Sequence, residues 1–365
     1  MNQFVKKLIF GIAVVFAILT GLHFGTAQAA TSGDYTLKPT TSDDSKVNVD
    51  GGFYLINGEP GETVDVKVEI YNTDKSDRKF LAMINTAYTN DEGNPGYDST
   101  QVSDPNLKIQ MKKITENNHQ IVPVAGDEST TVTFKVKVPS QRFSGYLMGG
   151  VNVSPYHEKA KGTVSQNGTL IKNKFSYSLP IQLTQKDSSG SDVNYKINSV
   201  KPKVISSGDN GQVGVAANVA NTKNAYLPDL SSHAVVTKYG DKKFKITTNK
   251  DNQSPVPTSN YNYGISWGDQ PLTAGKYHLK LTYSGNGVRN WTLNKDFVIT
   301  DAQATKYNKL AGHKPNYLWL YITLGVLLLA LILGLGIYLG NKKGQGSGKQ
   351  RNRNRSRRRN RSRRR

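Results

Sequence analysis

The chain has 365 residues, which is enough for two domains with accessory segments, and it contains no cysteine. The lack of cysteine excludes disulfide frameworks, thiolate metal sites and cysteine nucleophiles. Its 48 Lys and Arg residues outnumber its 27 Asp and Glu residues, giving a formal net charge of +21. Thirteen of the basic residues lie at or after Lys342, so the excess of positive charge belongs to one tail.

The first 29 residues predict a secretory signal peptide. Lys6 and Lys7 precede an uncharged apolar run from Leu8 to Leu22, and small residues follow up to Ala29. This order of basic, apolar and small-residue parts is typical of a leader that is cleaved, here after Ala29. An uncleaved anchor is the alternative.

The segment from about residue 33 to 185 predicts a first β-sandwich domain. "TVDVKVEIYN" (63–72) and "TVTFKVKVP" (131–139) alternate apolar with polar residues, which is the pattern of strands that bury one face. Turn signals such as Glu59-Pro60-Gly61 separate such segments. Short strands and frequent turns of this kind favour an antiparallel sandwich.

One loop of this domain has oxygen-rich side chains. "NDEGNPGYD" (90–98) carries carboxylates and amides, which are ligands that Ca²⁺ prefers. It lacks the spacing of an EF-hand, and its Gly93, Pro95 and Gly96 fit a plain hairpin loop. We prefer the hairpin interpretation over the calcium site.

A second domain is predicted from about residue 192 to 300. The polar stretch "TQKDSSGSDVN" (184–194) has the composition of a flexible joint. After it come seven strand candidates, as many as one immunoglobulin-like sandwich needs. They are "YKINSVKPKV", "QVGVAANVAN", "HAVVTKYG", "KFKITTN", "NYNYGISW", "KYHLKLTYSG" and "WTLNKDFVIT". Residues 301–317 are expected to form a juxtamembrane linker.

Three aromatic residues of the second domain are the candidate binding residues. Tyr261, Tyr263 and Trp267 lie close together in "SNYNYGISWGD" and would make a rigid ligand platform if they were exposed. The same spacing fits the core face of a strand, which is the interpretation that we prefer.

The segment from Leu318 to Leu339 predicts a transmembrane helix. Its 22 residues carry no charge, and a helix of that length spans roughly 33 Å, enough to cross a hydrocarbon core of about 30 Å. The basic tail, residues 340–365, follows at once, so the positive-inside rule places residues 30–316 outside the cell and the tail in the cytoplasm. No L-P-x-T-G sorting element precedes Leu318, so retention would depend on the uncut helix.

The arginines of the tail could contact anionic lipid in addition to fixing the orientation of the helix. An unstructured polycation also binds nucleic acid with little sequence preference. The residues concerned are Arg351, Arg353, Arg355, Arg357, Arg358, Arg359, Arg361, Arg363, Arg364 and Arg365.

The sequence carries no recognisable catalytic or metal-binding motif. Its six histidines are scattered without metal-ligand spacing, and G-x-S-x-G and P-loop elements are absent. The chain is therefore predicted to be a non-enzyme with no catalytic residues, no metal ligands and no cofactor.

Two groups of segments resemble a known family. "FYLINGEPGETVDVKVEIYNTDKSDRKFLAMINTAYTNDEGNPGYD" and "FSGYLMGGVNVS" are similar to the peptidoglycan-binding-type domain of WxL-interacting surface proteins of Gram-positive bacteria. "QVGVAANVANTKNAYLPDL" and "LTAGKYHLKLTYSGNGVRNWTLNKDFVIT" are similar to their host-binding-type domain. The order of signal peptide, two sandwiches, transmembrane helix and basic tail also matches. The resemblance implies contact with peptidoglycan, association with secreted WxL proteins, and adhesion to host extracellular matrix through the second domain.

The expected protein is all-β, with two tandem immunoglobulin-like β-sandwiches, an N-terminal signal peptide and one C-terminal transmembrane helix. Its expected function is that of a non-enzymatic scaffold at the cell surface, anchored in the cell membrane. The alternative is a protein that binds nucleic acid or anionic lipid through the arginine-rich tail.

Overall fold

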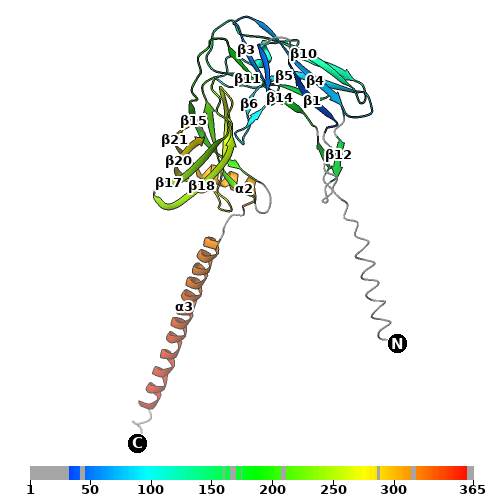
Figure 1. The fold of residues 1–365 in the computed structure, drawn as a ribbon. Helices are drawn as coiled ribbons and strands as arrows, with labels where there is room; N and C mark the ends of the chain where they lie inside the picture. The colour runs from blue at the N-terminus through cyan, green and yellow to red at the C-terminus, as the bar shows by residue number, and fades with distance from the viewer. Residues whose placement is uncertain are drawn as a thin grey trace, which may run out of the picture.

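The computed structural model describes residues 33–41, 46–158, 161–164, 170–173, 175–206, 211–285, 288–313 and 318–359. Two β-rich domains adjoin each other, and a long helix follows the second one (Figure 1). The predicted signal peptide lies outside the described residues.

The first domain is a sandwich of a four-stranded and a six-stranded sheet. In order across the smaller sheet, the strands are β1 (Tyr35–Thr40), β4 (Thr63–Asn72), β10 (Ser129–Lys137) and β8 (Thr115–Glu116). Across the larger sheet they are β2 (Val47–Asp50), β3 (Phe53–Gly58), β14 (Tyr177–Gln185), β11 (Leu147–Pro155), β5 (Arg78–Thr86) and β9 (Gln120–Val124). The shorter elements are β6 (Tyr88–Thr89), β7 (Pro95–Gly96), the 3-10 helix η1 (Met111–Ile114), β12 (Lys161–Val164) and β13 (Leu170–Asn173).

The predicted alternation of β4 and β10 is confirmed. In β4, Val64, Val66, Val68 and Ile70 are at most 1% exposed, and the residues between them face outward. The same alternation buries one face of β10, whose register with β4 is antiparallel over nine residue pairs. Both strands therefore contribute one apolar face to a core shared with the larger sheet.

The second domain contains the seven predicted strands in two sheets. The three-stranded sheet consists of β15 (Tyr195–Val204), β16 (Val213–Asn221) and β19 (Ser259–Ser266). The four-stranded sheet consists of β18 (Asp241–Gln253), β17 (Leu230–Lys238), β20 (Gly275–Gly285) and β21 (Val288–Ile299). A second, separate hydrophobic core lies between these sheets.

A helix, α2 (Asp301–Ala311), occupies much of the segment expected to be a linker. Thr300 caps its N-terminus in a capping box with Gln303, and Gly312 adopts a left-handed conformation at its C-terminus. Ala304 and Ala311 are buried in the core of the second domain. The segment is therefore an added element of the second domain, and the expectation of a linker beginning at residue 301 is corrected.

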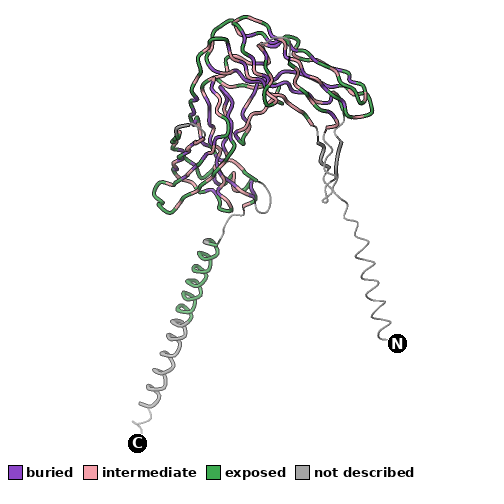
Figure 2. The backbone as a smooth tube through the Cα atoms, in the orientation of Figure 1, coloured by how far each residue is buried: buried purple, intermediate pink, exposed green. Residues whose placement is uncertain are grey.

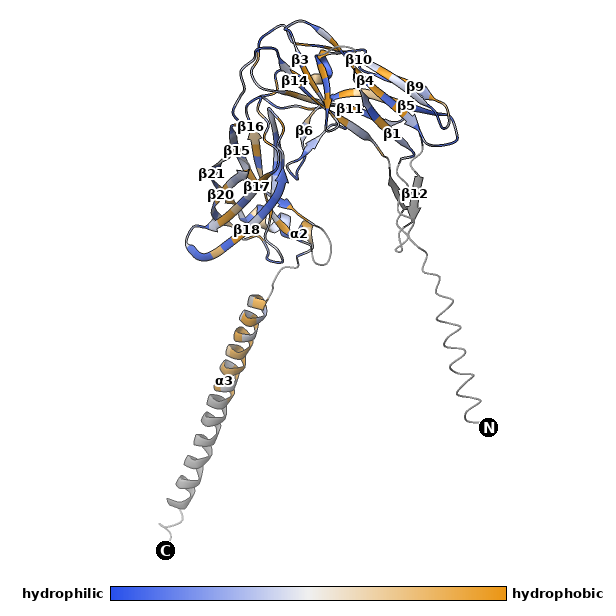
Figure 3. Ribbon diagram, in the orientation of Figure 1, coloured by the Kyte–Doolittle hydropathy of each residue, from blue (hydrophilic) through white to orange (hydrophobic). Residues whose placement is uncertain are grey.

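The helix α3 (Leu318–Arg359) stands apart from both domains. Its stretch Leu320–Leu339 has a mean hydropathy of 2.6 and none of it is buried by protein. Figure 2 shows the first turns of α3 as exposed, and Figure 3 shows the same turns as hydrophobic. An apolar helix of 20 residues without protein cover is long enough to span a membrane.

In each domain a central strand ends at a buried asparagine. Asn72 ends β4 opposite Tyr35, and Asn221 ends β16 opposite Tyr195, at equivalent register positions. Each asparagine is at most 1% exposed. Its amide nitrogen donates to backbone carbonyls of neighbouring turns: Ser76 (2.8 Å), Val124 (3.2 Å) and Ala125 (3.1 Å) for Asn72, and Ala225 (2.8 Å) and Val256 (3.4 Å) for Asn221.

Replacement of Asn72 by alanine is expected to lower the free energy of unfolding of the first domain by about 2–3 kcal/mol, because three backbone carbonyls, of which that of Val124 is buried, lose their donor. Asn48→Ala, at an exposed position of β2, should change it by less than about 0.5 kcal/mol. Denaturant titration of both variants measures the difference. Equal stabilities would contradict the structural role of Asn72.

Candidate functional site

The three aromatic residues singled out from the sequence are core residues. Tyr261 and Tyr263 lie on one face of β19, Trp267 directly follows the strand, and all three are at most 2% exposed. The Tyr261 hydroxyl lies 2.5 Å from the Tyr283 hydroxyl, and Ser232 donates to the Tyr263 hydroxyl at 3.0 Å. Burial raises the pKa of both tyrosines. These side chains are not available to a ligand at the surface, so they form the core face that we preferred from the sequence and not the alternative, a ligand platform.

The tail arginines lie partly on a helix. α3 continues past the apolar stretch to Arg359, so six of the ten candidate arginines belong to it. Arg361, Arg363, Arg364 and Arg365 lie outside the described residues. Among the residues that the structure does describe, no group of three or more His, Asp and Glu side chains has the geometry of a metal site.

The oxygen-rich loop forms a hairpin that contacts the second domain. β6 pairs antiparallel with β7, which confirms the hairpin interpretation of residues 90–98. At its tip, Asp91 forms an ion pair with Lys203 at 2.7 Å, and Glu92 forms one with Lys250 at 2.8 Å. The loop carboxylates therefore pair with lysines of the other domain.

The pKa of Asp91 is lowered by its place at this contact. Burial raises it, but the hydrogen bond and charge of Lys203 and the contacts of Asn262 outweigh burial. A depressed carboxyl pKa contributes stability that is complete above the unfolded pKa and is lost as the pH falls through the lower folded pKa. The ion pair at the hairpin tip is therefore maintained at neutral pH and is lost when the pH falls below the ordinary pKa of an aspartate.

Backbone contacts at the hairpin are close. The Ser254 N–H donates to the Gly93 carbonyl at 2.8 Å, and the Gln253 amide donates to the Glu92 carbonyl at 3.1 Å. Gly93 has a φ of +87°, and a β-carbon there would lie 2.3 Å from the Gln253 amide nitrogen. Glycine is therefore required at the tip of the hairpin by both conformation and space.

An apolar cluster and two hydroxyls lie behind the hairpin. Ala87 and Met148 of the first domain pack with Val256 of the second, and all three are buried. The Thr89 hydroxyl lies 2.5 Å from the Ser259 hydroxyl and accepts from the Val256 N–H at 3.0 Å. A buried apolar cluster flanked by hydrogen bonds between the domains indicates a fixed junction and not a flexible tether.

A second backbone contact joins the domains on another segment. Tyr146 donates its N–H to the Asn224 carbonyl at 2.7 Å, and Gly145 donates to the Ser189 carbonyl at 3.1 Å. Gly145 has a φ of +78°, and a β-carbon on it would lie 1.8 Å from the Asn224 carbonyl oxygen. The segment Gly145–Tyr146 thus lies directly against the second domain.

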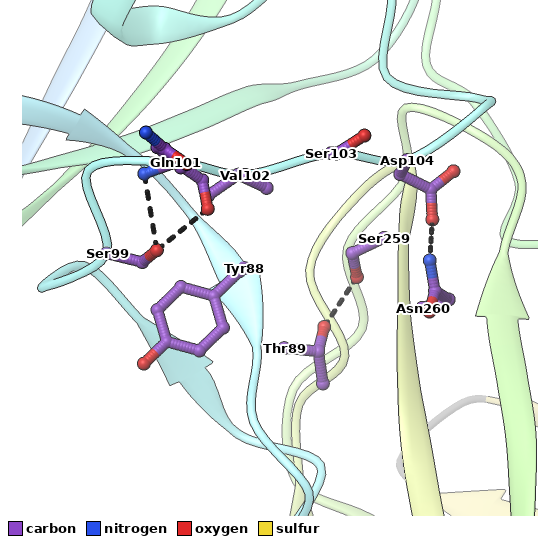
Figure 4. A pocket seen from close by; sticks show the side chains of 9 residues that line it. All are labelled: Tyr88, Thr89, Ser99, Gln101, Val102, Ser103, Asp104, Ser259 and Asn260. Atoms are coloured by element: carbon purple, nitrogen blue, oxygen red, sulfur yellow. Dashed lines mark hydrogen bonds between the residues drawn. The ribbon is translucent and has the colours of Figure 1, made fainter.

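Three open clefts border this junction. The first, of about 170 Å³, lies between Tyr88, Thr89 and residues 99–104 of the first domain and Ser259 and Asn260 of the second (Figure 4). In it Asn260 donates a short hydrogen bond to the Asp104 carboxylate. The second, of about 320 Å³, adjoins the ion pairs of the hairpin tip.

The third cleft, of about 340 Å³, is lined by both domains and by Ser191 between them. Its wall combines lysine and arginine with amide, hydroxyl and apolar side chains and contains no carboxylate. We call it the junction cleft. Clefts that lie between domains and mix apolar walls with a few polar groups are common ligand sites.

The fold and this junction define a two-domain β-sandwich protein with an apolar helix after its second domain. The family model of the WxL interacting protein peptidoglycan binding domain matches residues 35–155, and that of the WxL interacting protein host binding domain matches residues 166–309. The chain belongs to the family of WxL-interacting proteins, with the two domains in the predicted order. The second match includes most of α2.

No relative among the curated proteins matches the chain. Among solved structures it is similar at 10% identity and a TM-score of 0.29 to a chain from a chaperone and tip adhesin complex of CFA/I fimbriae, covering 71% of this chain and 97% of that one. It is also similar to the Pseudomonas aeruginosa CupB2 chaperone (10% identity, TM-score 0.25, 67% and 97% covered) and the E. coli chaperone DraB (12% identity, TM-score 0.26, 70% and 98% covered). Likenesses this low carry no argument about function.

Proposed function

We propose that the protein is a non-enzymatic scaffold of the cell surface, held in the cell membrane by α3. Its first domain binds peptidoglycan, its two-domain body associates with secreted WxL proteins, and its second domain contacts host extracellular matrix. The observation that carries the proposal is the pair of family-matched binding domains ahead of the uncovered apolar helix.

The charge after the helix supports the orientation. No acidic residue follows Asp301, and thirteen basic residues follow the apolar stretch. Basic residues next to a span remain on the cytoplasmic side. The sandwiches are therefore proposed to lie outside the membrane, with the tail inside and against anionic lipid.

Sedimentation with purified cell-wall sacculi tests the binding function. The full chain in detergent is expected to pellet with the sacculi. Depletion of the protein from the supernatant supports the proposal, and protein that remains in the supernatant contradicts it. Protease treatment of intact cells tests the orientation: the two domains should be removed, while an epitope after Arg365 stays protected. Loss of that epitope would contradict the proposed orientation with a cytoplasmic tail.

Replacement of both Leu329 and Leu331 by arginine is expected to release the protein from the membrane fraction. Each arginine near the centre of a span costs about 2.5–3.5 kcal/mol, whereas each leucine or isoleucine stabilises insertion by only about 0.3–0.6 kcal/mol. Two arginines therefore offset most of the favourable contribution of the stretch Leu320–Leu339. The matched control is alanine at both positions. Cell fractionation measures the distribution, and retention of the arginine variant would contradict anchoring by this helix.

A further inference from the structure

The junction cleft has the size and composition of a site for a small, charged ligand. It lies between residues 106–109 and 141–147 of the first domain and residues 222–224 and Thr258 of the second. Its volume of about 340 Å³ falls within the range of pockets that bind small molecules, roughly 300–1,000 Å³.

The charged groups of the cleft are all positive. Lys108, Arg142 and Lys223 line it, and no Asp or Glu does. Lys108 and Lys223 are exposed, and within the described part of the chain neither forms an ion pair. Arg142 donates to the Lys186 carbonyl at 3.0 Å, which positions its guanidinium at the cleft wall. Three cations without a counter-ion favour an anionic ligand.

The neutral groups of the cleft indicate what accompanies the anion. Amides and hydroxyls (Asn106, Gln141, Asn224, Ser144, Ser191 and Thr222) suit a ligand with several amides and hydroxyls. Half-buried Phe143 and buried Leu147 add an apolar wall. Methyl groups and the carbon faces of sugar rings fit such a wall, whereas a polyol phosphate chain has no comparable apolar part.

The cleft is held open by contacts on both sides. The Phe143 N–H donates to the Gln185 amide oxygen at 3.0 Å, and Gln185, which is buried, donates in turn to the Pro139 and Gln141 carbonyls at 2.6 and 3.1 Å. On the other side the Thr258 N–H donates to the Lys223 carbonyl at 3.1 Å. The wall is therefore formed before a ligand arrives, which lowers the entropic cost of binding.

We propose that the junction cleft binds a carboxylate-bearing muropeptide, with Lys108, Arg142 and Lys223 receiving its carboxylates and the apolar wall receiving its methyl groups or sugar ring. The inference rests on the proposed function, in which the protein contacts the wall. It adds that the second domain completes the wall-binding site, because Lys223 and Asn224 come from that domain.

The test is binding of N-acetylmuramyl tetrapeptide to the full chain in detergent, measured by calorimetry. Lys108→Gln combined with Lys223→Gln should weaken binding at least tenfold, since each lost charge-assisted contact is worth about that factor. The matched control is Lys245→Gln combined with Lys280→Gln, which removes two exposed lysines from β18 and β20. It should bind like the unaltered chain, and Lys223→Arg should largely retain binding.

The probe itself supplies a second comparison. The same muropeptide with its carboxylates amidated should bind at least tenfold more weakly to the unaltered chain. Unfolding temperatures equal to that of the unaltered chain establish that the lysine variants are folded, as expected for exposed positions.

Two results would overturn the inference while leaving the proposed function in place. One is a cleft variant that binds the muropeptide like the unaltered chain while both still sediment with sacculi. The other is displacement of sacculi by a purified polyol phosphate polymer but not by the muropeptide. If the unaltered chain binds neither sacculi nor muropeptide, the proposed function is rejected as well.

Discussion

Replacing Gly145 by alanine is expected to open the junction between the two domains. The residue has a φ of +78°, and an added β-carbon would overlap the Asn224 carbonyl oxygen at 1.8 Å. That oxygen belongs to the backbone and also accepts the Tyr146 N–H. Neither group can move aside while the hydrogen bond is kept, so the two segments must separate.

The expected cost combines two contributions. A left-handed conformation costs alanine about 1–2 kcal/mol relative to glycine. Loss of the hydrogen bond and of the contact around it adds at least about 1 kcal/mol. A total of about 2–4 kcal/mol is comparable to the stability of an interface between domains. A conformation in which the two domains are separated should therefore be populated.

Spin-label distances measure the separation. Because the chain has no cysteine, Thr131→Cys and Thr247→Cys place one label on each domain. The expected result for Gly145→Ala is a broad, lengthened distance distribution. Gly240→Ala is the matched control, because Gly240 has a φ of +80° but no atom lies within 4 Å of an added β-carbon. An unchanged distribution in Gly145→Ala would contradict the fixed junction.

Most of the fold could be predicted from the sequence because its signals are local. Alternation in β4 and β10 identifies which residues face the core, and the seven strands of the second domain coincide with seven alternating segments. The capping box of α2 was also present, since Thr300 and Gln303 have the required spacing. The segment nevertheless predicts a linker, because it lacks an apolar stripe.

The alternation in and after β19 also predicts that the three aromatic side chains are buried. Tyr261, Tyr263 and Ile265 alternate on one face of β19, and Trp267 continues the same spacing directly after the strand, so four large side chains are expected on one side. A face of that composition is expected to be buried.

The junction could not be predicted from the sequence, because it is formed by distant residues. Asp91 meets Lys203 across 112 positions, and Thr89 meets Ser259 across 170. Periodicity among neighbouring residues does not predict such pairs. Gly93 and Gly145 give only the weak signal that a glycine marks a turn or a close approach. The lysines of the junction cleft likewise are ordinary surface residues until the fold brings them together.

Replacing Trp267 by alanine is expected to have the largest effect on stability. The side chain is 2% exposed, and its ring lies 6.0 Å from that of Phe244 and 6.1 Å from that of Tyr277. Removing a buried tryptophan leaves a cavity and costs about 3–5 kcal/mol. The unfolding temperature of the second domain should fall by at least about 10 °C.

Trp267→Phe separates the packing contribution from the polar one. The indole N–H is buried with no hydrogen-bond partner among the described residues, and phenylalanine removes it while retaining an aromatic ring. Its cost should be below about 2 kcal/mol, because the smaller cavity is partly offset by removal of the unsatisfied donor. Tyr239→Ala is the surface control: its side chain is 52% exposed, and it loses only an exposed hydrogen bond to Asp296 and the contact with Lys276, so it should cost no more than about 1 kcal/mol. Calorimetric unfolding of the three variants distinguishes a core role from a ligand platform. If Trp267 belonged to a platform, Trp267→Ala would unfold at the temperature of the unaltered chain and lose only binding.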